Sequence, residues 1–109
     1  MIPELEPRDL AAWRADAARE APLVVDVREP NEHAVCLIDG SMTMPMQTVP
    51  SRAATELPRD RDLVIVCHHG NRSRRVAQWL EQAGYTRLFN LRGGVEAWAT
   101  DVDPTMPRY

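Results

Sequence analysis

The sequence contains no lysine, no long apolar run and only two cysteines. These absences exclude a membrane-spanning segment and a disulfide-based fold. Its uninterrupted apolar runs, such as residues 63–67, are far too short to cross a membrane. Cys36 and Cys67 can form at most one bridge, so the fold cannot depend on a network of disulfides. The acidic residues 1–6 contain no apolar signal core. We therefore expect a cytoplasmic protein whose two thiols are free.

The charge balance restricts the partners. All 13 basic residues are arginines, and 16 acidic residues outnumber them, so the formal net charge is −3. We therefore expect neither nucleic acid nor a membrane as a partner. Arginine still matters locally, because its guanidinium binds oxyanions through a fixed fork of donors. The length of 109 residues suits one domain, residues 1–109. We expect a monomer or a weak dimer, and nothing in the sequence identifies which.

Apolar segments alternate with helical patterns along the chain, which indicates an α/β fold with a mainly parallel sheet. We expect strands over residues 23–27, 63–66 and 87–91, and a short one at most over residues 42–45. We expect helices over residues 7–18, 28–35, 50–57 and 74–83, and a last short helix that ends at Trp98. The run at residues 63–66 is Leu-Val-Ile-Val, as in a strand covered on both faces.

The residues after this strand are the candidates for chemistry. Cys67 stands at its carboxyl end, a loop with Gly70 follows, and a helix comes next. In open α/β sheets, ligands bind beyond the carboxyl ends of the strands. Loop amides and a helix N-terminus favour an anion there, so the Cys67 thiol should ionise easily and act as a nucleophile. The alternative is an inert buried thiol.

Three arginines, Arg72, Arg74 and Arg75, crowd the start of that helix. Cations are disfavoured near a helix N-terminus by ~0.3–1 kcal/mol each, so their presence indicates a bound anion. Arg72 lies inside the loop and is the best candidate to bind an anionic substrate. Alternatively, the arginines are solvated surface residues that pair with acids elsewhere.

Three segments resemble the single-domain rhodanese family. Residues 67–73, Cys-His-His-Gly-Asn-Arg-Ser, look like its active-site loop. Residues 25–30, Val-Asp-Val-Arg-Glu-Pro, and residues 91–98, Leu-Arg-Gly-Gly-Val-Glu-Ala-Trp, resemble two further family segments in the expected order. The resemblance implies a five-stranded, mainly parallel sheet flanked by helices on both faces. It also implies a thiosulfate sulfurtransferase-like enzyme in which Cys67 becomes a persulfide.

The resemblance also implies roles for individual residues. The loop positions that would bind substrate are His68, His69, Gly70, Asn71, Arg72 and Ser73. Asp26 and Arg28 would hold the loop in shape, and neither a metal nor a cofactor is implied. The donor would be a small anion such as thiosulfate, and the acceptor a thiol or cyanide. His68 and His69 would shape the loop, and tuning of the persulfide near neutral pH is a second role open to them.

The chain departs from the family pattern at residues 36–41. Cys-Leu-Ile-Asp-Gly-Ser stands there where the family usually has Gly-His-Ile-Pro-Gly-Ala. We expect a locally altered loop. Cys36 is then either a small, semi-buried filler or a second thiol that resolves the Cys67 persulfide.

The sequence leaves three alternative functions open. A cysteine phosphatase or arsenate reductase has a related loop, but its signature places five residues between cysteine and arginine, and only four separate Cys67 from Arg72. A non-catalytic interaction module is a second alternative, although such modules can lack the cysteine that is present here. A metal site is the third, but adjacent residues do not easily converge on one tetrahedral ion. Its ligands would come from His33, Cys36, Cys67, His68 and His69.

Overall fold

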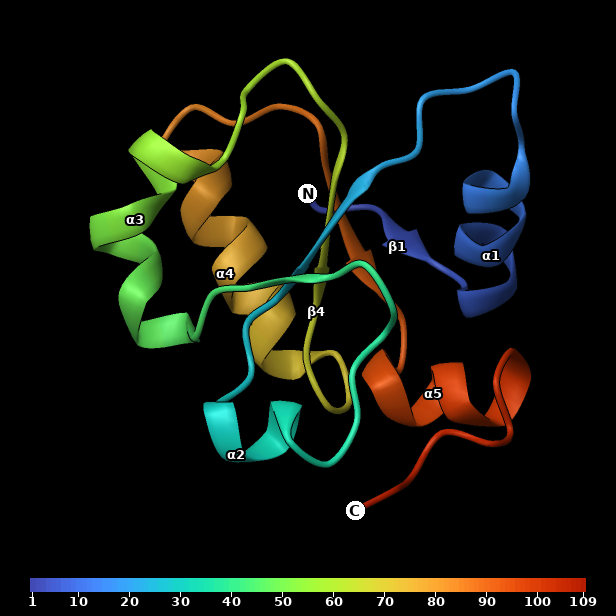
Figure 1. Ribbon diagram of the computed structural model, residues 1–109. Helices are drawn as coiled ribbons and strands as arrows, with labels where there is room; N and C mark the ends of the chain where they lie inside the picture. The colour runs from blue at the N-terminus through green and yellow to red at the C-terminus, as the bar shows by residue number, and fades with distance from the viewer.

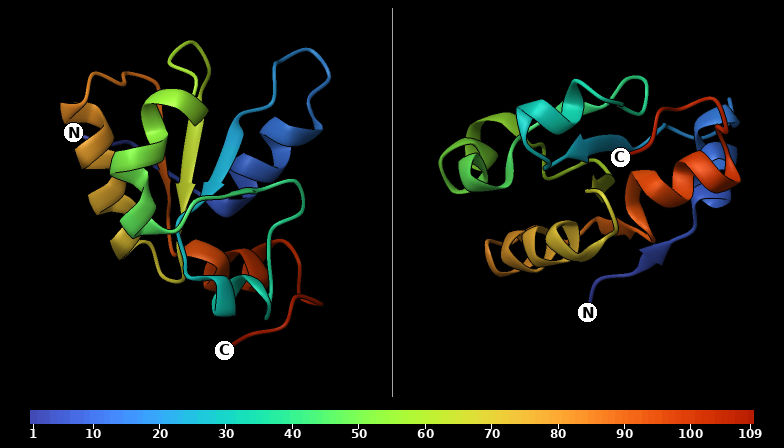
Figure 2. Two further views of the ribbon diagram at one scale, coloured as in Figure 1. Left: turned by 60° about the vertical axis from the view of Figure 1, so that its left-hand side comes forward. Right: turned by 90° about the horizontal axis from the view of Figure 1, so that it is seen from below.

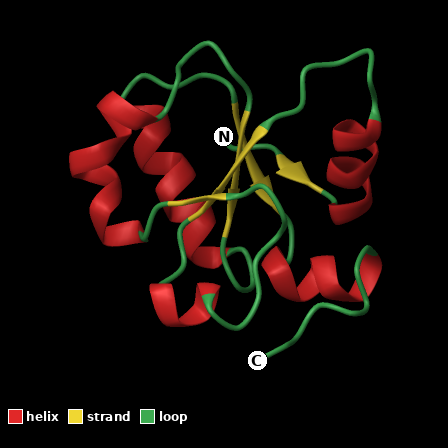
Figure 3. Ribbon diagram, in the orientation of Figure 1, coloured by secondary structure: helices red, strands yellow, loops and turns green.

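A computed structural model describes all residues from 1 to 109. Five strands form one parallel sheet in the order β1-β5-β4-β2-β3 (Figures 1 and 3). The strands are β1 (Glu4–Leu5), β2 (Leu23–Asp26), β3 (Met42–Thr43), β4 (Leu63–Val66) and β5 (Leu88–Leu91). The helices are α1 (Pro7–Ala15), α2 (Pro30–His33), α3 (Val49–Glu56), α4 (Asn71–Gln82) and α5 (Gly94–Asp101), with a 3-10 turn, η1 (Met46–Thr48). The predicted five-stranded α/β fold is thereby confirmed.

Alternate residues of the central strand β4 face two separate cores. Leu63 and Ile65 belong to the core that α3 and α4 cover, and Val64 and Val66 to the core that α1 and α5 cover. Figure 2 shows these helix pairs on opposite faces of the sheet. All four residues of β4 are fully buried. The strand therefore reads as a continuous apolar run, because both of its faces exclude water.

Most element boundaries lie within a few residues of the expected ones. α4 begins at Asn71, three residues before the expected start, because Gly70 caps it with a φ of 102° and the polar residues after it already form its first turn. α1 ends at Ala15 and not at residue 18. The last helix runs past Trp98 to Asp101. No helix has both the length and the apolar character needed to span a membrane.

The candidate residues lie at the carboxyl ends of the strands. Figure 1 shows α2, the start of α5 and the C-terminal segment gathered at the end of the molecule to which β2 and β4 lead. The amide of Val27, just after β2, donates to the carbonyl of Val66 at 2.9 Å. This bond aligns the ends of β2 and β4, so the residues that follow the two strands start side by side.

Candidate functional site

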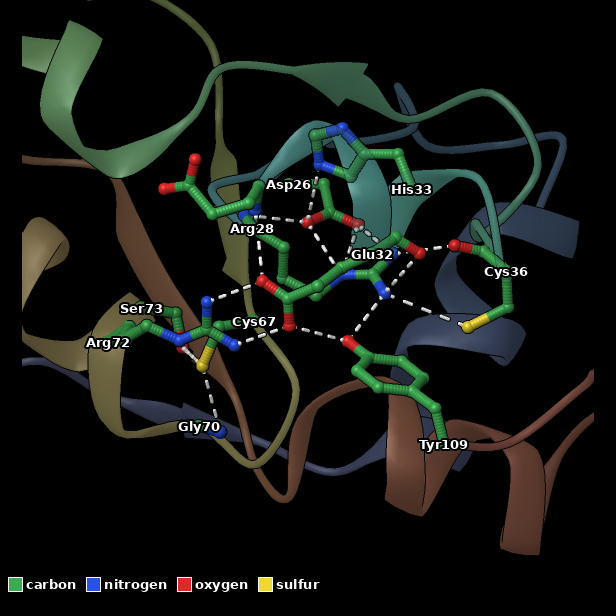
Figure 4. Close-up of polar contacts among 11 residues, drawn as sticks. Asp26, Arg28, Glu32, His33, Cys36, Cys67, Gly70, Arg72, Ser73 and Tyr109 are labelled. Carbon is green, nitrogen blue, oxygen red and sulfur yellow. Dashed lines mark hydrogen bonds and ion pairs between the residues drawn. The ribbon is translucent and has the colours of Figure 1, made fainter.

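Cys67 follows β4 directly, and its sulfur faces into the turn that the next six residues form. Its Sγ accepts a hydrogen bond from the Gly70 amide at 3.0 Å and lies 3.3 Å from Ser73 Oγ (Figure 4). The residue is only 1% exposed. Gly70 reaches this position with a φ of 102°, in the left-handed region that favours glycine. The loop thus aims one backbone amide at the sulfur and places the hydroxyl oxygen of Ser73 beside it.

The other amides of the loop have no acceptor within the protein. Gly70 donates to Cys67 Sγ, but none of the remaining backbone N–H groups between His68 and Ser73 makes a hydrogen bond to a protein atom. Three of them belong to the first turn of α4, where helix geometry leaves N–H groups unpaired. Free main-chain amides at the N-terminus of a helix favour an anion.

The N-terminus of α5 fixes the shape of the loop by donating hydrogen bonds to two of its carbonyl groups. The amide of Val95 donates to the carbonyl of Cys67 at 2.9 Å, and the amide of Glu96 to the carbonyl of His68 at 3.2 Å. A Cβ at Gly94 would overlap both carbonyl oxygens, so only glycine allows this approach. The Gly93-Gly94 segment therefore allows the first amides of α5 to hold the loop carbonyls close to that helix.

A buried amide side chain anchors the far side of the loop. Asn90 on β5 donates through Nδ2 to the carbonyl of Gly70 at 3.1 Å and to Glu4 Oε1 at 3.0 Å. Its Oδ1 accepts a hydrogen bond from the hydroxyl of Ser73. Asn90 and Ser73 are both fully buried. Together they join β1, β5 and the start of α4 around the cysteine.

Asp26 and Arg28 form a fully buried ion pair at the end of β2. Arg28 Nη2 lies 2.7 Å from Asp26 Oδ2 and also donates to the carbonyl of Cys36 at 2.8 Å. Burial lowers the pKa of Arg28, but hydrogen bonds to Asp26 and Tyr109 outweigh it and raise the pKa above its ordinary value. Neither side chain hydrogen-bonds to residues 67–73. The pair therefore holds α2 and the residues that follow it in place beside the site.

Glu32 of α2 links that side to the loop, and the sequence analysis did not identify it. Arg72 donates to both of its oxygens, at 2.7 and 2.9 Å. These bonds hold the pKa of the Glu32 carboxyl well below its usual range and raise the pKa of Arg72. The expected anion-binding arginine is thus paired with a carboxylate. No spacing in the sequence relates Glu32 to Arg72, which lies 40 residues further on.

Tyr109 is the second residue that the sequence analysis missed. Its hydroxyl accepts from Arg28 Nη1 at 2.8 Å and donates to Glu32 Oε2 at 2.8 Å. Burial, with the hydrogen bond to Glu32, raises the pKa of Tyr109 to about 12. Its ring stacks on His68 with 3.9 Å between centroids, and His68 stacks on His69 at 4.0 Å. Burial, and then the neighbouring His69, lower the pKa of His68, which favours the neutral imidazole.

The remaining predicted residues lie at the edge of the site. Asn71 is exposed and accepts a long hydrogen bond from Arg74 at 3.5 Å. Arg74 also pairs with Glu4 at 3.1 Å, as expected of a surface arginine that meets an acid elsewhere. Arg75 has no carboxylate partner and lies beside Trp79 in a groove between α3 and α4. Arg72, Arg74 and Arg75 therefore contact three different parts of the molecule, since Arg72 pairs with Glu32.

Cys36 and the histidines do not form a metal centre with Cys67. Both cysteines are free thiols, and Figure 4 shows them on opposite sides of the Arg28 side chain. The Cys36 sulfur lies 3.7 Å from Arg28 Nη1, and His33 lies 3.3 Å from Asp26. No three His, Cys, Asp or Glu side chains are grouped so that they could hold a metal ion.

Comparison with known proteins finds similarity over nearly the whole chain. The family model described as the rhodanese-like domain matches residues 7–101. A sulfurtransferase from Allochromatium vinosum is 42% identical over 99 residues, which are 91% of this chain and 90% of that protein. The thiosulfate sulfurtransferase GlpE of Pseudomonas fluorescens is 38% identical over 88 residues, 78% of either chain. A rhodanese-like domain protein from Staphylococcus aureus has a similar solved structure, with a TM-score of 0.82, 26% identity and 99% coverage of both chains.

Proposed function

The chain belongs to the rhodanese-like family of sulfurtransferases, and we propose that Cys67 carries the transferred sulfur as a persulfide. We further propose that the donor is a small sulfane-sulfur anion such as thiosulfate. The acceptor is a thiol or cyanide. Residues 1–109 act as one catalytic domain in the cytoplasm.

One observation carries this proposal: the free amides around the Cys67 sulfur. A persulfide adds a second, negatively charged sulfur atom beyond Sγ. The amides of residues 68, 69, 71, 72 and 73 have no protein acceptor and are available to stabilise it. A hydrogen bond to an ionised group contributes about 1.5–3 kcal/mol, so a few such bonds favour the persulfide anion strongly.

The chemistry needs few further groups. The Cys67 thiolate attacks the outer sulfur of thiosulfate, an S–S bond to Cys67 forms, and the bond to the sulfite sulfur breaks. The electron pair of that bond leaves with sulfite, which is stable as a dianion, so no general acid is needed. The acceptor thiolate or cyanide then attacks the outer sulfur and restores the Cys67 thiolate.

The residues around the cysteine would support this exchange without taking part in proton transfer. Gly70 donates to the sulfur, and Asn90 accepts the hydroxyl proton of Ser73 and so keeps the Ser73 oxygen in place beside the sulfur. The lowered pKa of His68 favours a neutral ring, which leaves it the role of shaping the loop. Asp26 and Arg28 hold α2 against the site.

The test is the intact mass of the protein after incubation with thiosulfate and removal of excess donor. The wild-type chain should gain one sulfur atom, and cyanide should remove it as thiocyanate. Cys67→Ser should gain none, whereas Cys36→Ala should load like the wild type and serves as the matched control. Sulfur gain by Cys67→Ser, or its absence from the wild type with every sulfane-sulfur donor, would overturn the proposal.

A further inference from the structure

Four hydrogen bonds hold the Glu32 carboxylate at the site. Two come from Arg72, one from the hydroxyl of Tyr109 at 2.8 Å and one from the amide of Glu29 at 3.0 Å. The bond from Glu29 belongs to the capping box at the start of α2, so it fixes the side chain to its own helix. Glu32 is therefore an ionised group with a fixed position and not a surface side chain that meets Arg72 by chance.

The carboxylates at the site balance its arginines. Three ion pairs surround the loop: Arg28 with Asp26 at 2.7 Å, Arg72 with Glu32 at 2.7 Å and Arg74 with Glu4 at 3.1 Å. Burial lowers the pKa of His68 and so favours its neutral form. Arg75, which has no carboxylate partner, lies in the groove beside Trp79. Attraction for an anion at Cys67 therefore comes from main-chain amides and not from an unpaired cation.

This balance of charges at the site should affect two kinds of sulfur donor differently. Thiosulfate is a dianion, and its sulfite part brings negative charge to the mouth of the site, where the fork of Arg72 is already occupied by Glu32. A persulfide carried on a thiol, R–S–S⁻, has its single charge on the sulfur to be transferred, which the loop amides receive. Its carrier R needs no charge, so it does not oppose Glu32.

We propose that Glu32 determines donor specificity by keeping Arg72 from the substrate, so that the site prefers persulfides carried on a thiol over thiosulfate. The inference rests on the proposed persulfide chemistry of Cys67. In the exchange, the Cys67 thiolate attacks the outer sulfur of R–S–S⁻, the new S–S bond forms on Cys67, and the electron pair of the old bond leaves with R–S⁻. The step needs no oxidant or reductant.

Tyr109 acts as a positioning residue in this arrangement. Its hydroxyl accepts from Arg28 and donates to Glu32, and its ring lies on His68. Figure 4 shows the hydroxyl between the Arg28 guanidinium and the Glu32 carboxylate. It thereby connects the buried Asp26–Arg28 pair to the ion pair that faces the loop.

The test measures the rate at which Cys67 gains sulfur from two donors, thiosulfate and the persulfide of 2-mercaptoethanol, whose carrier is uncharged. Glu32→Gln keeps the shape of the side chain and removes its charge. We expect the ratio of the thiosulfate rate to the persulfide rate to rise about tenfold, a typical effect of one nearby charge at a partly solvated site. Tyr109→Phe keeps the stacked ring and should shift the ratio in the same direction by about threefold, because Glu32 is then held less firmly against Arg72.

Glu56→Gln is the matched control. Glu56 also accepts two hydrogen bonds from one arginine, Arg52, on the exposed side of α3, so this change alters the net charge equally without touching the site. It should leave both rates unchanged. A ratio that stays constant in Glu32→Gln and Tyr109→Phe would overturn the inference while leaving the proposed function intact. If the wild type gains sulfur from neither donor, the proposed function itself fails.

Discussion

Arg28 has the largest fully buried side chain in the protein, and its charge is matched by Asp26. Arg28→Ala would leave Asp26 buried without its partner, which costs about 3–5 kcal/mol of unfolding free energy. Urea denaturation would show this as a large drop in the midpoint. Arg52→Ala removes an arginine from an exposed pair on α3 and should leave the midpoint almost unchanged. Equal effects of the two substitutions would refute the structural role assigned to Arg28.

Arg72 is the residue whose replacement tests the charge at the site. In Arg72→Ala, Glu32 stays in place without its partner and faces the incoming donor. We expect the KM for thiosulfate to rise by about tenfold or more, and the KM for a persulfide on an uncharged thiol to rise much less. Steady-state kinetics with both donors provide the measurement. Equal losses with the two donors would mean that Arg72 only supports the loop.

Cys36 stands where the family pattern has glycine, and the structure separates it from Cys67 by the Arg28 side chain (Figure 4). We predict that Cys36→Ala lowers stability by about 1 kcal/mol, because it removes a small buried group. It should hardly change turnover with a weak acceptor. A several-fold loss of turnover would make Cys36 part of the mechanism.

Individual site residues could be predicted from the sequence where they are close neighbours in the chain. Cys67, Gly70 and Ser73 belong to one short loop, so their meeting follows from local chain geometry. Glu32 and Tyr109 could not be found in this way. They contact each other across 77 residues of sequence, and only the folded sheet brings them to the same edge.

Among the elements, α5 has the most direct effect on the loop, because its first amides hold the carbonyls of Cys67 and His68. Gly94→Ala would force a Cβ against those carbonyls in a left-handed backbone position. We expect a loss of about 2–5 kcal/mol in unfolding free energy, together with strongly reduced sulfur loading.

The control for this prediction is Gly40→Ala. Gly40 has a similar positive φ of 80°, but a Cβ there would meet only the flexible end of Arg14 at 3.4 Å. The backbone strain should cost about 1–2 kcal/mol and leave sulfur loading intact. Equal loading by the two variants would contradict the role given to α5.

The longer elements were predictable because each carries its own local pattern of apolar residues. The stretch Leu63–Val66 is apolar at every position, and α4 presents Val76 and Leu80 to one core. The strand β1 was not predictable from its own residues, since Glu4 and Leu5 contain no period at all. Its identity depends on pairing with Asn90 and Leu91, which are distant in the chain.

The whole molecule should respond to acid through Glu32. Its folded-state pKa is lowered by Arg72, so its contribution to stability is complete above the ordinary pKa of ~4.3 and is lost as the pH falls through the folded value. The difference in unfolding free energy between the wild type and Glu32→Gln should therefore shrink below about pH 4.3. Urea midpoints from pH 3 to pH 7 measure this difference. A constant difference over that range would refute the assignment.

The pairing of the first strand with the last has a consequence for synthesis of the chain. β1 has no neighbour in the sheet except β5, so Glu4 and Leu5 wait for their partners until residues 88–91 have left the ribosome. Asn90, which fixes both Gly70 and Ser73, arrives with the same segment. The loop around Cys67 is therefore enclosed only after residues 88–91 have emerged, and a nascent chain without β5 carries the cysteine but not the enclosed loop.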